Sequence, residues 1–184
     1  MKVIGIVGSP RKGGNTDILV RQALTGAHAA GAETAVIYLN DMVFQDCQGC
    51  GYCKGTNVCR LKDDMYPVYE DLVSADGLVI GSPVYFGQMT GNTKSFIDRW
   101  YALVNPDFTS RLPPGKKVVL IFPQGDANPS MFEGMATHFE VTMTFFGLEV
   151  TEIIIAPGLL AAGEAKESEE LMRRAFAAGK DLAQ

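Results

Sequence analysis

The residues with the most distinctive chemistry are four cysteines inside a span of thirteen residues: Cys47, Cys50, Cys53 and Cys59. Thiolates are ligands for iron and zinc, and the same groups form disulfides and react with oxidants. A disulfide framework that staples a fold spreads its cysteines along the chain, whereas these four are gathered in one segment. The grouping therefore indicates a local metal-binding or redox-active site.

The spacing of these cysteines, Cys-x2-Cys-x2-Cys-x5-Cys, favours an iron–sulfur cluster. A compact trio followed by a fourth cysteine is typical of ferredoxin segments that bind a [4Fe–4S] cluster. Zinc sites more often use two Cys-x2-Cys pairs that a longer spacer separates. Three interpretations stay open: a cluster held by all four thiols, a cluster-free loop with free thiols or a disulfide, and a zinc site.

A second candidate site is the glycine-rich segment from Gly8 to Thr16, Gly-Ser-Pro-Arg-Lys-Gly-Gly-Asn-Thr. It lies between an expected strand and an expected helix, where free backbone N–H groups and the positive helix end favour an anion. It matches neither Gly-x-x-x-x-Gly-Lys-Ser/Thr nor Gly-x-Gly-x-x-Gly, so a phosphomonoester such as FMN fits better than a nucleoside triphosphate or a dinucleotide. The alternative is an ordinary glycine-rich turn with an Asn or Thr helix cap. The expected phosphate-binding residues are Ser9, Arg11, Gly14, Asn15 and Thr16.

The elements that position these segments alternate along the chain. Apolar and amphipathic runs take turns, with Gly and Pro between them, which is typical of a parallel sheet covered by helices on both faces. Strands are expected at residues 3–8, 35–39, 77–81, 118–122 and 150–155, and helices at 15–30, 65–74, 91–104, after 129 to about 146, and 164–183. Asp64 is the expected N-cap of the second helix. We predict an α/β fold: a flavodoxin-like, doubly wound three-layer sandwich whose five-stranded parallel sheet has the order 2-1-3-4-5.

Length and composition predict one domain over residues 1–184, with a cysteine-rich insertion at about residues 40–64. A connection of that length is usually functional or carries structure of its own. Hydrophobic residues make up 47% of the chain and its net charge is −5, so neither nucleic acid nor a membrane is an expected partner. No apolar stretch has the length of a spanning helix and no leader segment is recognised. We expect a cytoplasmic protein.

Three segments carry a resemblance to a known family. Gly8 to Thr16, after an N-terminal strand, resembles the phosphate loop of the NADPH-dependent FMN reductase family of flavodoxin-like proteins. Ala75 to Gly87 resembles that family's third strand and flavin-ring loop, and Lys94 to Arg99 resembles the helix that follows. The cysteine run and its flank, Cys59 to Met65, resemble the iron-sulfur flavoprotein branch, whose members carry FMN and a cluster near a dimer interface.

The resemblance implies FMN as cofactor, a [4Fe–4S] cluster on the four cysteines, and NAD(P)H as electron donor. It also implies that the flavin ring is lined by Pro83, Val84, Tyr85, Phe86 and Gly87. For Tyr85 or Phe86 taken singly, packing in the core is an equal alternative. The loop after the fourth strand should reach the same crevice, with Gln124, Gly125 and Asp126 at the pyrimidine edge, although it departs from the family's Gly-Gly-rich pattern.

The function predicted from these features is an FMN-dependent oxidoreductase of iron-sulfur flavoprotein type. One alternative is a cluster-free NAD(P)H-dependent FMN or quinone reductase; another is a non-enzymatic electron carrier or thiol redox sensor. Donors and acceptors would be NAD(P)H, a quinone or a ferredoxin-like carrier, and the resemblance implies a homodimer or homotetramer. No catalytic acid or base is identified. His28 and His138 lie in expected amphipathic helices, where surface or packing roles are expected. Lys94 and Asp98 are expected as a surface ion pair.

Overall fold

The computed structural model describes residues 1–184 and contains one parallel sheet of five strands in the order β2-β1-β3-β4-β5, as predicted. The strands are β1 (Lys2–Val7), β2 (Glu33–Tyr38), β3 (Gly77–Gly81), β4 (Lys117–Pro123) and β5 (Glu149–Ala156). β3 is buried along its whole length, because the central strands of a parallel sheet are covered on both faces. Its exclusively small and aliphatic sequence, Gly-Leu-Val-Ile-Gly, follows from that position.

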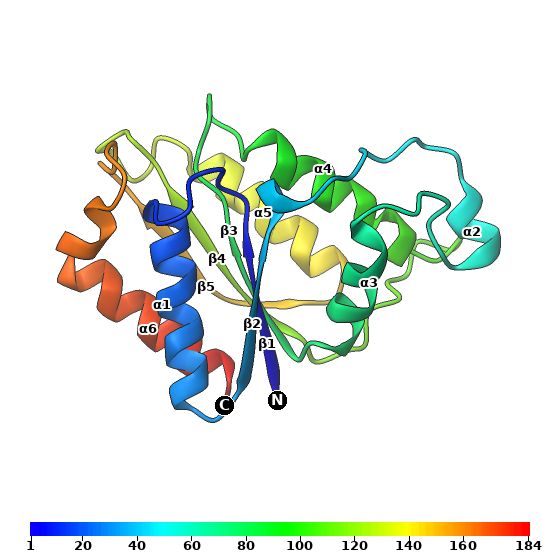
Figure 1. Cartoon of the computed structure of the whole chain (residues 1–184), viewed down its shortest axis with the longest axis horizontal. Coiled ribbons are helices and arrows are strands. Elements are labelled where there is room, and N and C mark those ends of the chain that lie inside the picture. Colours follow the sequence, from blue (N-terminus) through cyan, green and yellow to red (C-terminus); the bar gives the residue numbers. More distant parts are fainter.

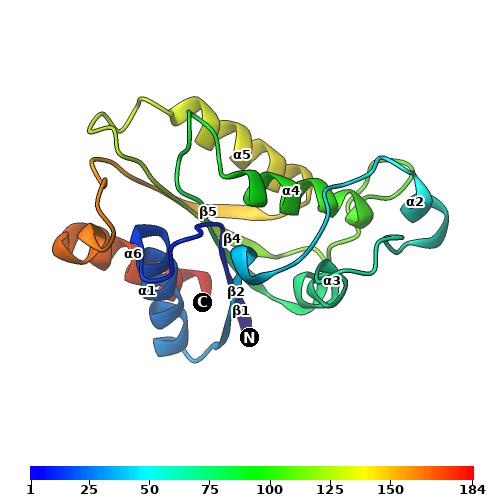
Figure 2. The same cartoon turned by 45° about the horizontal axis from the view of Figure 1, so that its top comes forward.

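Helices cover both faces of the sheet, which gives the three layers of a flavodoxin-like fold (Figures 1 and 2). α1 (Asn15–Ala29) and α6 (Glu169–Leu182) share one hydrophobic core with the sheet, whereas α3 (Met65–Ser74), α4 (Gly91–Arg99) and α5 (Glu133–Phe145) share the other. α1 and α6 lie unusually close together, since a Cβ atom at Gly179 would stand 1.8 Å from the carbonyl oxygen of Ala23. Glycine at this position therefore sets the spacing of the pair.

Several expected helices are shorter than predicted. The helix expected to reach residue 104 ends at Arg99 and continues as a 3-10 turn, Trp100–Leu103. α6 starts at Glu169 because the hydroxyl of Ser168 accepts a hydrogen bond from the Leu171 amide, which caps the helix there. His28 lies on α1 and His138 lies on α5, and both side chains are exposed. Lys94 Nζ pairs with Asp98 Oδ1 at 2.6 Å, as predicted.

The connection between β2 and α3 does have structure of its own. It contains a 3-10 turn at Leu39–Asp41 and a short helix, α2 (Tyr52–Thr56). In both cartoon views α2 lies at one end of the molecule and the α1–α6 pair at the other (Figures 1 and 2). The cysteines are therefore carried on a projection from the sandwich. No helix in the chain combines the length and the apolar character needed to cross a membrane.

Asp64 precedes α3 as predicted, but its side chain does not cap the helix. Its backbone is already helical (φ −64°), so the carboxylate cannot fold back onto the first helical N–H groups, and it accepts a hydrogen bond from Val43 N at 2.6 Å instead. Asp63 takes the capping role, because its Oδ1 accepts a hydrogen bond from Met65 N at 3.2 Å. Its Oδ2 accepts a second hydrogen bond, from Gln45 N at 3.1 Å. The two acids thus close the base of the cysteine-bearing connection.

Candidate functional site

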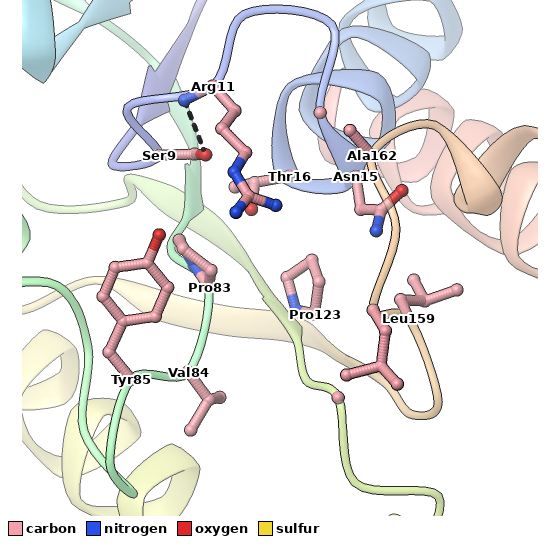
Figure 3. Close-up of a pocket in the computed structure, with 13 residues that line it drawn as sticks. Ser9, Arg11, Asn15, Thr16, Pro83, Val84, Tyr85, Pro123, Leu159 and Ala162 are labelled. Atoms are coloured by element: carbon pink, nitrogen blue, oxygen red, sulfur yellow. Dashed lines mark hydrogen bonds between the residues drawn. The ribbon is translucent and has the colours of Figure 1, made fainter.

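A cavity with a volume of about 310 Å³ opens at the carboxyl ends of the central strands. Figure 3 shows its lining, to which α1, the β3 and β4 exits and the segment after β5 all contribute. Nine of the thirteen predicted cofactor-binding residues line it: Ser9, Arg11, Gly14, Asn15, Thr16, Pro83, Val84, Tyr85 and Gly125. Four lining residues were not predicted: Pro123, Leu159, Leu160 and Ala162.

The phosphate-loop side of the cavity is rich in hydrogen-bond donors. Gly14 is the N-cap of α1 and has no side chain, so the first N–H groups of the helix receive no side-chain cap and stay available to an anion. Ser9 is buried and its Oγ accepts a hydrogen bond from Arg11 N at 3.2 Å. Figure 3 shows the Arg11 guanidinium extending into the cavity near Thr16. This arrangement suits a phosphate group.

A buried carboxylate holds the loop from behind. Asp17 is 4% exposed and accepts hydrogen bonds from Gly13 N (2.7 Å), the Tyr38 hydroxyl (2.9 Å) and Arg21 Nε (3.0 Å). Gly13 has a φ of +72°, the left-handed conformation that favours glycine. Burial raises the pKa of Tyr38, which keeps the phenol protonated as a donor. Sequence reasoning missed Asp17 and Tyr38; the one local signal was an acid in the first turn of a helix.

Asn15 was predicted to donate to the phosphate, but its side chain also fastens the opposite wall of the cavity. Its Nδ2 donates to the Ala161 carbonyl at 2.8 Å, and its Oδ1 accepts from the amides of Gly163 (3.0 Å) and Ala165 (3.1 Å). These bonds hold the segment after β5 against α1 and bring Leu159 to the cavity. No sequence signal indicated a contact between residues nearly 150 positions apart.

The β3 exit forms the side of the cavity where the flavin ring was predicted. Val84 N donates to the Pro123 carbonyl at 2.9 Å, which joins the two strand exits, and Figure 3 shows Tyr85 beside Pro83. Backbone bonds between Tyr85 and Gln88 close a tight turn whose central residues, Phe86 and Gly87, both have positive φ. The turn carries Phe86 and Gly87 away from the cavity. The Phe86 side chain is fully exposed at its tip.

The β4 exit contributes its backbone and Gly125 rather than polar side chains. The Gln124 side chain is buried and donates to the Asn128 carbonyl at 2.7 Å, and Asp126 is exposed and accepts from Asn128 N, so neither of these predicted residues lines the cavity. A Cβ atom at Gly125 would lie 2.5 Å from Leu160 Cδ2. Glycine at position 125 therefore lets Leu160 pack across the strand exit.

The four cysteines line one small second pocket, where they are joined by Gln48, Gly51, Arg60, Leu61, Arg99, Tyr101 and Ala102. All four are free thiols; Cys53 is buried and Cys50 is exposed. Burial raises the pKa of the Cys53 thiol. Four sulfur donors from one segment fit an iron–sulfur group in type and number. The side chains are not gathered into a ligand shell: no three Cys, His, Asp or Glu residues are arranged to hold a metal ion.

Cationic side chains dock this segment onto the body of the fold. Lys54 Nζ donates to the carbonyls of Tyr101 (2.9 Å) and Val104 (2.6 Å) and lies over the Tyr101 ring at 3.5 Å. Burial lowers the pKa of Lys54. Arg111 Nη2 donates to the Cys53 carbonyl at 3.1 Å. The backbone around the cysteines is thus held by positive groups.

α4 connects the two pockets. At its N-terminus, the Thr90 hydroxyl donates to the Gly8 carbonyl at 2.8 Å, directly beside the phosphate loop. At its C-terminus, Arg99 contacts Asp63 and Cys59. This short helix therefore runs from the start of the glycine-rich loop to the cysteine pocket.

The fold is that of a flavodoxin-like protein, and its cavity lies beside the glycine-rich loop that follows β1. Over residues 1–165 the chain matches the family described as NADPH-dependent FMN reductase, and it belongs to that family.

Similar proteins fall into two groups. An iron-sulfur flavoprotein of Methanocaldococcus jannaschii is 46% identical over 99 residues, which are 54% of this chain and 51% of that protein. A Bacillus subtilis protein named as an NAD(P)H-dependent FMN-containing oxidoreductase is 28% identical over 164 residues, 86% of each chain. The chain thus matches about half the length of the iron-sulfur flavoproteins.

Among solved structures, the NAD(P)H:quinone oxidoreductase from Methanothermobacter marburgensis superposes with a TM-score of 0.78 at 18% identity, covering 100% of this chain and 98% of that one. An archaeal flavodoxin superposes with a TM-score of 0.63 at 16% identity, covering 100% and 96%. At these identities the likeness establishes the fold.

Proposed function

We propose that the protein is an FMN-dependent oxidoreductase of iron-sulfur flavoprotein type, which moves electrons between a reduced donor and an acceptor. The observation that carries this proposal is that four cysteines of one segment line a single pocket. They do so in a chain that belongs to the NADPH-dependent FMN reductase family and has a cavity beside its glycine-rich loop. The proposed donor is NAD(P)H, and the proposed acceptor is a quinone or a ferredoxin-like carrier. We further propose a cytoplasmic homodimer or homotetramer.

The cavity residues divide into two groups in this proposal. Ser9, Arg11 and Thr16, with the first N–H groups of α1, bind the phosphate of FMN, while Asp17 keeps the loop in shape. Pro83, Val84 and Tyr85 pack on the flavin ring through their apolar and aromatic atoms. Bound FMN supplies two-electron chemistry with the donor and one-electron chemistry with a cluster or carrier.

At the second pocket, the proposal assigns all four thiols to a [4Fe–4S] cluster. The type and number of donors support it, as does the set of cations around the segment, since a cluster with four thiolates carries net negative charge. The cysteines come together on binding, because a metal group supplies the energy that orders its ligands.

The second candidate function is a cluster-free NAD(P)H-dependent FMN or quinone reductase. Two observations favour it: the cysteine side chains are not arranged as a metal site, and the Bacillus subtilis relative matches over most of both chains. In this case the cysteines would remain thiols and the FMN cavity would have the same role.

Anaerobic purification with quantitation of flavin, iron and sulfide separates the two candidates. The proposal expects one FMN per chain, with iron and sulfide in the proportions of one [4Fe–4S] cluster. FMN without iron, after anaerobic reconstitution as well as in the purified protein, leaves the cluster-free reductase. Protein that neither releases flavin on denaturation nor binds added FMN contradicts both.

Turnover assays then identify the chemistry. Oxidation of NADH or NADPH is followed with a quinone, free flavin or ferredoxin as acceptor under anaerobic conditions. Turnover with a nicotinamide donor supports an enzyme. A flavin that is reduced chemically but by neither nicotinamide, and that exchanges electrons only with carrier proteins, instead identifies an electron carrier.

A further inference from the structure

Arg99 is a buried cation in contact with the cysteine segment. It is the last residue of α4 and is 1% exposed. Its Nη1 donates to the Gln45 carbonyl (2.6 Å) and to Asp63 Oδ2 (2.6 Å). Its Nη2 donates to Asp63 Oδ1 (3.0 Å) and to Cys59 Sγ (3.4 Å). One side chain therefore binds the segment before the first cysteine, at the last cysteine, and after it.

Burying the Arg99 guanidinium costs free energy, and Asp63 by itself supplies one opposite charge. Removing a guanidinium from water costs several kcal/mol, which the bidentate pair with a carboxylate repays only in part. The Arg99–Asp63 pair could form without any further partner of the guanidinium. Instead the guanidinium extends to a carbonyl and a sulfur, so its position also serves the cysteine segment.

The other cations near this segment make different contacts. Lys54 and Arg111 donate to backbone carbonyls, and Lys94, on the same helix as Arg99, pairs with Asp98 on the surface. Arg99 is the one cation in the structure that donates a hydrogen bond to a thiol sulfur. Hydrogen bonds to sulfur and nearby charge are among the factors that set the reduction potential of thiolate-bound groups.

We propose that Arg99 is a positioning residue of the cysteine site, which fixes the segment from Gln45 to Asp63 and places a permanent positive charge against Cys59 Sγ. The charge favours electron density on that sulfur and raises the reduction potential of a group that the thiols hold. The inference deepens the proposed function in that it treats the cysteines as a redox site. Its first test uses the free thiols and is independent of iron.

The first test compares two alkylating reagents of similar size, anionic iodoacetate and neutral iodoacetamide, on the iron-free full chain. The same thiolate attacks both reagents. The rate with iodoacetate divided by the rate with iodoacetamide at one cysteine is therefore independent of the thiolate fraction and reports the local charge. The ratio is measured peptide by peptide with mass spectrometry. Arg99→Gln should lower it at Cys59 by about threefold or more, as expected for the loss of one nearby charge.

Matched variants separate charge from structure. Arg99→Lys keeps the charge and should retain most of the wild-type ratio at Cys59. Lys94→Gln removes a charge from the same helix but on the surface, and should leave the ratio unchanged. The ratio at exposed Cys50 is the internal reference and should be unaffected in all variants. If Arg99→Gln does not fold, the double variant Asp63→Asn/Arg99→Gln, which leaves no unpaired buried charge, takes its place.

The second test is a reduction potential. In reconstituted protein, Arg99→Gln should shift the one-electron equilibrium of the iron–sulfur group at least tenfold towards the oxidised form, about 59 mV lower. Arg99→Lys and Lys94→Gln should lie close to wild type. An unchanged alkylation ratio at Cys59 in folded Arg99→Gln protein, or an equal change at Cys50, overturns the proposal. If wild-type protein binds no iron, the cluster assignment fails, and the alkylation ratio still decides the role of Arg99.

Discussion

The phosphate loop and the cysteine segment are both short, glycine-containing stretches, yet they are built in opposite ways. The loop from Gly8 to Thr16 is held by the sheet, by α1 and by the buried Asp17 carboxylate, and its cavity is already open. The cysteine segment projects from the fold, most of its residues are exposed, and cations from other elements anchor it. A site made from backbone N–H groups forms with the fold, whereas the proposed thiol site would be completed by the group that it binds.

The sharpest test of this comparison is to remove one site and measure the other. Cys50→Ser should abolish iron binding, because a cluster loses one of its four ligands, and should leave FMN affinity unchanged, since Cys50 lies outside the cavity. Iron content after anaerobic reconstitution and FMN titration by fluorescence measure the two effects. Loss of FMN together with iron would show that the sites are not independent.

The next largest effect should be on stability at the base of the cysteine segment. Asp63→Asn leaves Arg99 buried without its counter-charge and should lower the free energy of unfolding at pH 7 by roughly 3 kcal/mol. Urea unfolding measures it. The control is Asp71→Asn, which removes the partner of Lys2 in a half-buried pair at the surface and should cost less than about 1 kcal/mol.

The difference in stability between wild type and Asp63→Asn should depend on pH. Burial by itself raises the pKa of Asp63, but hydrogen bonds from Arg99 and Gln45 N outweigh it and hold the pKa below its ordinary value of 3.8. A carboxyl with a lowered folded-state pKa contributes stability above its ordinary pKa and loses it as the pH falls through the folded value. The wild-type advantage over Asp63→Asn should therefore be complete at pH 7 and shrink below about pH 4. An advantage that grew with acidity would contradict this.

A smaller effect concerns the phosphate end of the cavity. Arg11→Gln removes a charge-assisted hydrogen bond worth about 2 kcal/mol, so FMN should bind roughly thirtyfold more weakly. The neighbouring Lys12 is a matched control, because it pairs with Asp41 and does not line the cavity. Lys12→Gln should change the Kd by less than about threefold. Equal losses in both variants would mean that the loop attracts phosphate by general charge rather than through Arg11.

The smallest effect is predicted at the tip of the β3 exit. Phe86→Ala should change FMN affinity by less than about twofold, because the side chain is fully exposed and points out of the cavity. Tyr85→Ala, one residue earlier and in the cavity lining, should weaken binding by about tenfold through lost ring packing. If the two variants weaken binding equally, Phe86 reaches the flavin in the bound state.

Much of the fold was predictable because its pattern is local. Hydrophobic periodicity, with the Gly and Pro residues between elements, predicted every strand within two residues of its observed ends. The predicted phosphate-loop residues line the cavity because they follow directly on β1. The prediction was weaker for side chains whose partners are distant in sequence. Gln124 and Asp126 were selected by loop position alone, and hydrogen bonds within their own loop turn them from the cavity.

The sequence by itself determined the alternation of strands and helices, the location of the glycine-rich loop at the start of α1, and the confinement of all thiols to one segment, since each depends on neighbouring residues. The strand order was predicted from that alternation, because right-handed crossovers leave few topologies. Only the tertiary structure decided that Asn15 holds the far wall of the cavity and that Arg99 contacts Cys59. These contacts join residues 40 to 150 positions apart, and they exist because the crossover connections between parallel strands bring segments that are distant in sequence together in space.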